Sequence, residues 1–247
     1  MAKYDFRSPR LYLEAPLAAL QEVALTPEQA HYVRNVMRLA DGAEVLLFNG
    51  HDGEWRARIG ASGKRGATAL PQEQTRPQPE TFGLRYAFAP LKHARLDYMV
   101  QKAVEMGASR LSPVLTQFTQ VNRTNPERMR ANVIEAAEQC GILALPEIDE
   151  AVPLQKWLAS LDPAAAIVFC DENAEETSPV EALRAAGKNR ELAVLIGPEG
   201  GFSEAERRLL IGRDSVIRLS LGPRILRADT AAVAALALVQ SVCGDWR

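Results

Sequence analysis

The chain has 247 residues, enough for one large domain or two modest ones. Hydrophobic residues make up 47% and charged residues 24%, as in ordinary globular proteins, so the core can be sizeable and needs no disulfide staples. The formal net charge of −2 neither demands nor forbids a nucleic-acid partner, because positive charge can be concentrated locally. The apolar run that comes nearest to a membrane span, 231–239, is too short to cross a bilayer.

The three cysteines, Cys140, Cys170 and Cys243, have no second cysteine or histidine at metal-ligand spacing, so we expect no metal site. An odd number of cysteines, in a chain whose first residues lack an apolar signal core, indicates a reducing, cytoplasmic location. The sequence also lacks a Ser–His–Asp pattern, which argues against a hydrolase.

Strand-like segments dominate the first part of the chain. We expect strands at 11–13, 44–49 and 54–59, with Asn-Gly and Asp-Gly turn signals between the last two. One helix is expected over 27–38, with Thr26 as its N-cap and Pro27 at its first position. These elements predict a small β-barrel-like domain over residues 1–73.

The segment 71–79 is polar and carries three prolines, which predicts a linker that divides the chain near residue 75. After it, apolar strands alternate with helices. The expected strands cover 84–89, 111–115, 165–170, 192–196 and 216–221, and the expected helices 94–106, 126–140, 179–186, 204–211 and 230–242. Such alternation predicts an α/β domain over residues 74–247, with a parallel sheet covered by helices.

A glycine-rich loop, Ile196-Gly-Pro-Glu-Gly-Gly-Phe202, follows one of the predicted strands. Its glycines permit positive φ angles and the close approach of a ligand to the backbone. Ser203 and Glu206 form a capping-box pattern at the start of the next helix. The loop matches neither a dinucleotide fingerprint nor a P-loop. A tight turn that needs glycine and a ligand-binding loop both fit this composition.

A second loop, residues 219–230 (LSLGPRILRADT), also leaves a strand and enters a helix. Arg224 and Arg227 lie three residues apart in an otherwise apolar stretch, and Asp229 or Thr230 is expected to cap the helix. Two arginines are more than a cap needs, which favours a functional role over a solvated turn. Ligands of open α/β sheets bind at the carboxyl ends of the strands, where both loops are predicted to lie.

The segments LIGPEGGFSEAE (195–206) and LSLGPRILRADTA (219–231) resemble the RsmE family of ribosomal RNA methyltransferases, in the knotted SPOUT superfamily. Further stretches look like other motifs of the family, in the same order: HYVRNVMRLADG (31–42), QKAVEMGASRLSPVLTQFT (101–119), EAAEQCG (135–141) and LPEI (145–148). Together these motifs cover nearly the whole chain.

The resemblance implies S-adenosylmethionine-dependent methylation of N3 of one uridine, position 1498, in 16S ribosomal RNA of the small ribosomal subunit. It also implies a PUA-like RNA-binding first domain, a SPOUT-type second domain with a trefoil knot, and a homodimer. The chain departs from the family pattern at Asp229, where a glutamate is usual, and after Gln139, where an arginine is common.

By this resemblance, the cofactor occupies a cup between the two loops. The residues expected to contact it are Leu195, Ile196, Gly197, Pro198, Glu199, Gly200, Leu219, Ser220, Leu221, Gly222, Arg224, Ile225, Leu226 and Thr230. Asp171 and Glu172 end another predicted strand at the same edge, where they either approach the sugar of the cofactor or form a solvated turn.

The chemistry of the uridine suggests which side chains act on it. N3 of uridine is a weakly acidic imide, so the enzyme must favour its anion, and Arg224 and Arg227 are candidates for stabilising that charge. Asp229 or Glu199 is a candidate for accepting the proton, and solvent is the alternative.

Basic residues of the first part of the chain are candidates for binding RNA phosphates. His31, Arg34 and Arg38 have the three- and four-residue spacing of one helical face, although a solvated face has the same pattern. The full set of expected RNA-binding residues is Arg7, Arg10, His31, Arg34, Arg38 and Arg123, the last within a second basic patch over 116–130.

Two other functions remain open at this point. One is a related knotted methyltransferase that modifies another RNA site, and the other is an RNA-binding assembly protein without catalysis. The intact glycine loop with Arg224 and Arg227 favours catalysis, and the order of the motifs favours 16S ribosomal RNA.

Overall fold

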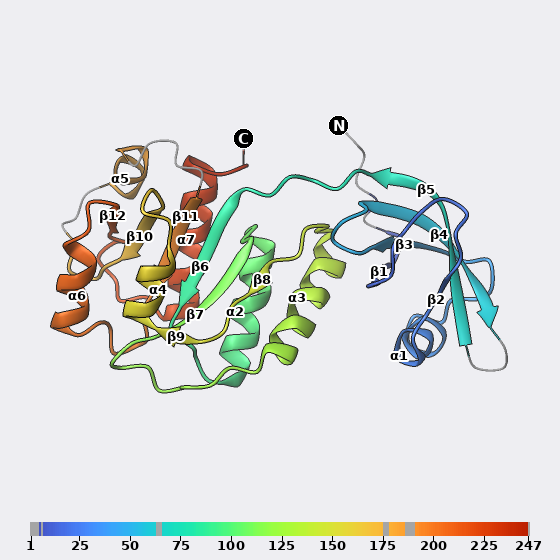
Figure 1. Ribbon diagram of the computed structural model, residues 1–247, viewed down its shortest axis with the longest axis horizontal. Helices are drawn as coiled ribbons and strands as arrows, with labels where there is room; N and C mark the ends of the chain where they lie inside the picture. The colour runs from blue at the N-terminus through green and yellow to red at the C-terminus, as the bar shows by residue number, and fades with distance from the viewer. Residues whose placement is uncertain (1–4, 6, 63–65, 175–177, 186–190, 247) are drawn as a thin grey trace. The chain divides into compact units, whose positions relative to one another are not determined.

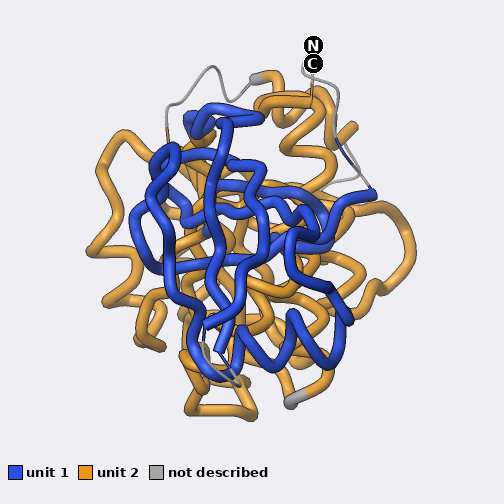
Figure 2. The backbone as a smooth tube through the Cα atoms, turned by 90° about the vertical axis from the view of Figure 1, so that its right-hand side faces the viewer, with its two compact units in different colours: residues 1–80, 137–145 blue, residues 81–136, 146–247 orange. Residues whose placement is uncertain are grey.

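The computed structural model describes the chain except residues 1–4, 6, 63–65, 175–177, 186–190 and 247 (Figure 1). The chain forms two compact units, residues 1–80 with 137–145 and residues 81–136 with 146–247 (Figure 2). Each unit has its own sheet and its own hydrophobic core. No helix among the described residues is long and apolar enough to cross a membrane.

The sheet of the first unit has the strand order β1-β3-β4-β5-β2. Strands β1 and β3 pair in parallel, and the other neighbours are antiparallel. The bounds are β1 Arg10–Tyr12, β2 Val23–Ala24, β3 Glu44–Phe48, β4 Glu54–Ser62 and β5 Gly66–Arg76. The short strand β2 and the long strand β5 were not predicted from the sequence.

Strand β5 corrects the expected linker, because its last six residues, 71–76, continue the pairing with β4. The carbonyl of Pro71 accepts a hydrogen bond from the backbone N–H of Leu20 at 2.8 Å, on the side away from β4. The nitrogen of a strand residue points to the same side as its carbonyl, so the missing N–H of proline costs no bond with β4.

The predicted helix over 27–38 is instead an α-helix, α1 (Pro27–His31), followed by a π-helix, η1 (Tyr32–Val36). The N-cap prediction is confirmed, since Thr26 accepts a hydrogen bond from Gln29 N in a capping box. A π-turn holds more residues than an α-turn, so α-helical spacing no longer places basic residues on one face. Arg38 also lies beyond the helix, with a φ of 56°.

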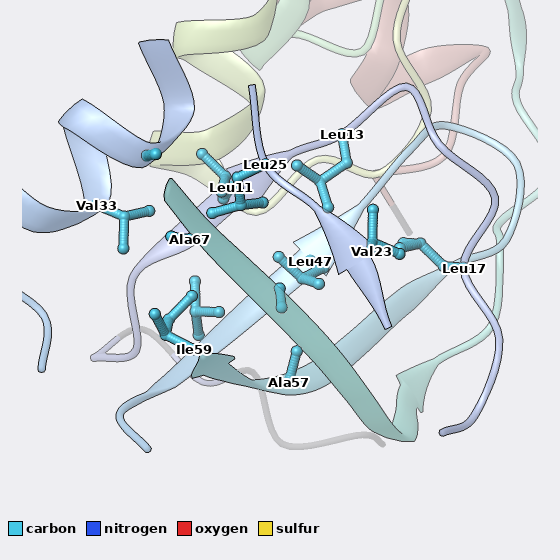
Figure 3. Packing of buried hydrophobic residues seen from close by; sticks show 13 residues of the cluster. Leu11, Leu13, Leu17, Val23, Leu25, Val33, Leu47, Ala57, Ile59 and Ala67 are labelled. Carbon is cyan, nitrogen blue, oxygen red and sulfur yellow. The ribbon is translucent and has the colours of Figure 1, made fainter. Parts of the chain in front are cut away.

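The core of the first unit forms where alternate residues of the strands meet residues from the helix and loops (Figure 3). Because strand side chains point alternately to opposite faces, every second residue enters this core. Those residues are Val45 and Leu47 of β3, Ala57 and Ile59 of β4, and Ala67 and Ala69 of β5.

A buried ion cluster joins residues 137–145 to the rest of the first unit. Glu54, with 2% of its surface exposed, accepts hydrogen bonds from Arg10 Nε at 3.0 Å and Arg76 Nη2 at 2.6 Å. Arg76 Nη2 also donates to the carbonyl of Gly141 at 2.9 Å. Gly141 has a φ of 65°, and a Cβ there would lie 3.2 Å from Arg10 Cζ. Glycine therefore fits this close approach of the two segments.

The sheet of the second unit has the order β12-β10-β11-β6-β7-β8, and all its strand pairs are parallel. The bounds are β6 Gly83–Phe88, β7 Arg110–Leu115, β8 Glu147–Ile148, β10 Ala166–Cys170, β11 Glu191–Ile196 and β12 Val216–Leu219, while β9 (Val152–Pro153) pairs with the end of β7. The five predicted strands are confirmed, although β12 ends two residues early. The two-residue strands β8 and β9 are too short to show a periodic pattern.

Helices cover both faces of this sheet (Figure 1). Helix α4 packs against alternate residues of β10 and β11, and α7, with α2 beside it, lies against β11 from the other face. The bounds are α2 His93–Glu105, α3 Pro126–Cys140, α4 Leu154–Ser160, α5 Pro179–Ala185, α6 Glu204–Ile211 and α7 Ala228–Val242. Helix α4 was not predicted, and residue 186, the expected end of α5, lies outside the described residues. The α/β class of the second domain is confirmed.

Candidate active site

Three strands of the second unit end side by side at one edge of the sheet. Strand β10 pairs in parallel with both β11 and β12, so their carboxyl ends meet there. A pocket of about 430 Å³ opens at this edge, lined by residues from 169–174, 196–207 and 219–231. The structure thus brings the two loops singled out from the sequence to one cavity.

Two glycines of the first loop are required by the packing and the backbone conformation of the loop itself. A Cβ at Gly197 would overlap the ring of Phe202, which stacks edge-on against Phe169 with ring centroids 5.1 Å apart. Gly201 has a φ of 68°, a conformation that favours glycine. The capping box at the start of α6 is confirmed, with Ser203 and Glu206 as its partners. Packing against Phe202 and a positive φ angle therefore account for Gly197 and Gly201 in the segment between β11 and α6.

The two arginines of the second loop are exposed to solvent. Arg224 and Arg227 are exposed and line the pocket, and neither makes an ion pair within the described part of the chain. Ile225 between them is 96% exposed. Gly222 has a φ of 94° with open space around it, so its role is conformational.

The predicted cap of α7 is wrong by two or three residues. The N-cap is Arg227, without a side-chain cap bond, and Asp229 and Thr230 lie inside the first turn. The Asp229 carboxylate accepts a hydrogen bond from Thr230 N at 2.9 Å, near the positive end of the helix dipole. Asp229 is partly buried and does not line the pocket.

Most of the expected cofactor residues line the pocket: Ile196, Gly197, Pro198, Glu199, Leu219, Ser220, Leu221, Gly222, Arg224, Ile225 and Leu226. Three do not. Leu195 is buried in the core on the α4 side, Gly200 lies against Phe118, and Thr230 is exposed on α7. Gly201 and Pro223, which belong to the two loops expected to form the cup, also line it. The pocket residues that the sequence did not predict include Phe169, Cys170, Ala174, Phe202, Arg207, Ala228 and Ala231.

Asp171 directly follows β10 and is among the residues that line the pocket, but its carboxylate is held by two arginines. Its two oxygens accept hydrogen bonds from both Nη atoms of Arg207 and, at 2.8 Å, from Arg218 Nε. Burial raises the pKa of Asp171, but hydrogen bonds from Arg207, from Asn173 N–H and from Arg218 lower it more, so the net pKa lies below the usual 3.8. Asp171 is therefore a charged, structural group.

Glu172 is the neighbouring carboxylate and differs in exposure. It is exposed, lines the pocket and lies 3.2 Å from the position of a Cβ on Gly201. Of the two acids considered for a sugar contact, Glu172 is thus the accessible one.

Glu199 lines the pocket with its carboxylate held by a hydrogen bond from Arg95 Nη1 of α2 at 3.0 Å. Both side chains are substantially exposed. Because the pair is reached by solvent, the Arg95 contact orients the carboxylate more than it stabilises the fold.

Cys170 also lines the pocket, but its thiol is not set up as a nucleophile. Burial, with the Asp171 charge beside it, raises the pKa of Cys170 to about 12, which keeps the sulfur protonated at neutral pH. No group of three or more histidine, cysteine or acidic side chains among the described residues could hold a metal ion.

Two of the expected RNA-binding arginines have structural partners inside the first unit. Arg10 is buried, with its guanidinium in the Glu54 cluster. Arg34 donates to the carbonyls of Leu39 and Gly60 at 3.0 and 3.1 Å and pairs with Asp41, which fastens the turn after η1. Both guanidinium groups therefore bind partners inside the first unit.

The remaining expected RNA-binding residues are exposed: Arg7, His31, Arg38 and Arg123. His31 Nδ1 lies 2.9 Å from Asn35 Nδ2 on the same helical segment. In the second basic patch, Arg128 is paired with Asp97, so Arg123 carries the more available charge there.

The chain matches the model of an RNA methyltransferase domain over residues 78–240 and that of an RNA methyltransferase PUA domain over 25–72. Ribosomal RNA small subunit methyltransferase E of Rickettsia conorii is 32% identical to it, over 94% of each chain.

Two solved structures resemble the whole chain. Ribosomal RNA small subunit methyltransferase E from Neisseria gonorrhoeae, bound to S-adenosyl methionine, matches 98% of this chain and 100% of its own, with a TM-score of 0.86 and 26% identity. A Legionella pneumophila protein in complex with bound SAM matches 97% of this chain and 99% of its own, with a TM-score of 0.84 and 29% identity. The chain therefore belongs to the RsmE family of RNA methyltransferases, with a PUA-like first domain and an α/β methyltransferase second domain.

Proposed function

We propose that this protein transfers the methyl group of S-adenosylmethionine to N3 of one uridine, at position 1498, of 16S ribosomal RNA. The observation that carries the proposal is the pocket of about 430 Å³ between two glycine loops, with Arg224 and Arg227 unpaired within the described structure at its wall. The family membership and the names of the relatives support the reaction and the RNA.

The residues of the pocket fit this cofactor. Its volume falls within the range of small-molecule sites, about 300–1,000 Å³. Its walls combine apolar side chains, such as Ile196 and Leu221, with backbone groups of the loops, which suits an adenine ring. The Glu172 carboxylate is placed to accept hydrogen bonds from sugar hydroxyls. When bound, S-adenosylmethionine supplies a methyl group on a sulfonium for in-line transfer.

The side chains of the pocket account for the charge that develops on the uridine. As the N3–H proton leaves, negative charge spreads onto the base oxygens, and Arg224 and Arg227 stabilise it. Glu199 is the better placed of the two candidate proton acceptors, since it lines the pocket and Asp229 does not. The Glu199 carboxylate would take the N3 proton, so that N3 could accept the methyl group that S-adenosylmethionine would supply.

The RNA is held by phosphate contacts that carry no sequence information themselves. The exposed residues Arg7, His31, Arg38 and Arg123 are the candidates, while Arg10 and Arg34 are left out because of their structural partners. A homodimer, a cytoplasmic location and an RNA substrate held within the small ribosomal subunit belong to the same proposal, by resemblance to the family.

The test is to incubate the purified protein with labelled S-adenosylmethionine and small ribosomal subunits that lack the modification, and then to map the labelled base. Label at N3 of the single uridine is expected, with Arg227→Ala as the matched inactive variant. Label at another base would identify a related methyltransferase with a different target. Absence of both label and cofactor binding would leave a non-catalytic RNA-binding assembly protein.

A further inference from the structure

We infer that Asp171 is a positioning residue that holds both loops of the cofactor pocket in their binding conformation, through Arg207 and Arg218. The inference rests on the proposed function, because it concerns the affinity of this pocket for S-adenosylmethionine.

The three residues connect the three segments that build the pocket. Asp171 directly follows β10, Arg207 lies on α6 just after the first loop, and Arg218 lies on β12 just before the second loop. Arg207 reaches Asp171 with both Nη atoms, and Arg218 reaches it with Nε at 2.8 Å. One carboxylate therefore fixes the two loops relative to each other.

Backbone hydrogen bonds complete this connection. Asp171 N donates to the carbonyl of Leu219 at 3.1 Å, and Asp171 Oδ1 accepts from Asn173 N at 3.0 Å. Arg218 Nη2 donates to the carbonyl of Asn173 at 2.6 Å. The turn after β10 is thereby tied to the first residue of the second loop.

Burial makes the arrangement rigid. The Asp171 side chain is 0% exposed, whereas that of Arg207 is 15% and that of Arg218 35% exposed. A buried carboxylate must keep its partners, because separating them leaves an uncompensated charge in a poorly solvated place. Movement of the start of α6 or the end of β12 away from β10 would require that separation, and each of these elements anchors one end of a loop.

The same geometry argues against a direct contact between Asp171 and the cofactor. Its two oxygens already accept four hydrogen bonds, from two guanidinium groups and one backbone N–H. A carboxylate offers about four lone-pair positions, so none is left for a ligand. Asp171 acts on the pocket through its arginine partners.

A carboxylate with similar partners, although with 27% of its side chain exposed, lies in the same unit and does not line the pocket. Asp149 follows β8, accepts hydrogen bonds from Arg110 Nη1 at 2.8 Å and Ser112 Oγ at 2.6 Å, and lies 3.7 Å from Arg85 Nη1. None of these four residues lines the pocket. Asp149→Asn therefore removes a similar cluster without touching the loops.

The experiment compares Asp171→Asn and Asp149→Asn in the full-length protein. Isothermal titration with S-adenosylmethionine measures Kd, urea unfolding measures stability, and methyl transfer to small subunits separates KM from kcat. We expect Asp171→Asn to raise both the Kd and the KM for the cofactor about tenfold or more, because the contacts that position the two loops are lost. At saturating cofactor its kcat should fall much less. Asp149→Asn should lower stability with less than about a twofold change in Kd.

Equal Kd values for the two variants, whether both changed or both unchanged, would overturn the inference. If Asp171→Asn does not fold, Arg218→Lys replaces it, with Arg110→Lys as its control. The lysine keeps a positive charge near Asp171 but loses the bond to Asn173, so a rise of about threefold in Kd is expected. An unchanged Kd in Arg218→Lys would overturn the inference. A wild-type protein that does not bind S-adenosylmethionine would overturn the proposed function as well.

Discussion

The two edges of the second sheet carry similar charged clusters but differ in what surrounds them. At the carboxyl ends of β10 and β12, Asp171 is held by two arginines, and near the amino ends of β6 and β7, Asp149 is held by two others. The first edge has glycine loops that leave a pocket, and none of the residues of the Asp149 cluster lines it. An arginine-bound carboxylate is therefore no mark of a functional site by itself.

The two edges also differ in how many of their arginines form ion pairs with carboxylates. Arg85 and Arg110, near the amino ends, each contact two carboxylates. At the pocket, Arg207 and Arg218 share one carboxylate, and Arg224 and Arg227 have none among the described residues. The pocket edge thus keeps positive charge that the fold does not use, available for an anionic transition state.

The largest expected effect follows from removing that unused charge. Arg227→Ala should lower kcat about 10²- to 10³-fold, as loss of one preorganised donor to a developing anion does. Steady-state methyl transfer to unmodified small subunits measures this. Arg110→Ala, at the opposite edge, should reduce stability and leave kcat unchanged per folded molecule. Equal kcat values for the two variants would remove the distinction between the edges.

The proposed proton acceptor, Glu199, gives the next effect. Glu199→Gln keeps the shape of the side chain but removes its basicity, and kcat should fall about 10²-fold, as is typical for loss of a general base. Asp229→Asn, outside the pocket, should have a smaller effect. If kcat at neutral pH were unchanged in Glu199→Gln, solvent would be the acceptor.

Two glycines of the pocket loops should differ in what an added methyl group costs. Gly197→Ala drives a Cβ into the Phe202 ring and should lower the free energy of unfolding by about 1–3 kcal/mol. Gly222→Ala meets no atom within 4 Å but must keep a φ of 94°, so about 1 kcal/mol is expected from backbone strain. Urea unfolding monitored by circular dichroism measures both, and a reversed order would contradict the packing described for the first loop.

Acid stability should report the Asp171 ion pairs. The folded-state pKa of Asp171 lies below the usual 3.8, so the unfolded chain binds more protons over the interval between the two values. The stabilisation is present above the usual pKa and is lost as the pH falls through 3.8 towards the folded value. The free-energy difference between wild type and Asp171→Asn, from urea unfolding at several pH values, should therefore shrink on acidification. A constant difference would mean that the Asp171 charge does not stabilise the fold.

Hydrophobic periodicity and the positions of glycines allowed the strands, helices and glycine loop of the second unit to be predicted from the sequence. The alternation of apolar strands and helices predicted the second sheet, and the glycine-rich loop after β11 predicted one wall of the pocket, although Gly200 lies against Phe118 instead. Proline composition led to the wrong prediction at 71–79, because Pro71 faces away from β4 and its missing N–H therefore costs no bond with that strand. The π-turn of η1 was invisible to an α-helical pattern.

Long-range contacts lie beyond such patterns. In the Asp171 cluster, the two arginines lie 36 and 47 positions after Asp171 in the sequence. The hydrogen bond from Arg76 to Gly141 spans 65 positions. Nothing in local spacing distinguishes Arg207 and Arg218, which the fold pairs, from Arg224 and Arg227, which it leaves open. Only the packing of three strand ends determines which of these four arginines are paired and which are left exposed.

Amide hydrogen exchange with and without S-adenosylmethionine tests most directly whether the carboxyl edge of the second sheet is the cofactor site. We expect slower exchange on binding in residues 196–203 and 219–228, and unchanged exchange in 109–112 and 147–149 at the opposite edge. Protection confined to the opposite edge, or no protection in either loop at saturating cofactor, would contradict the account.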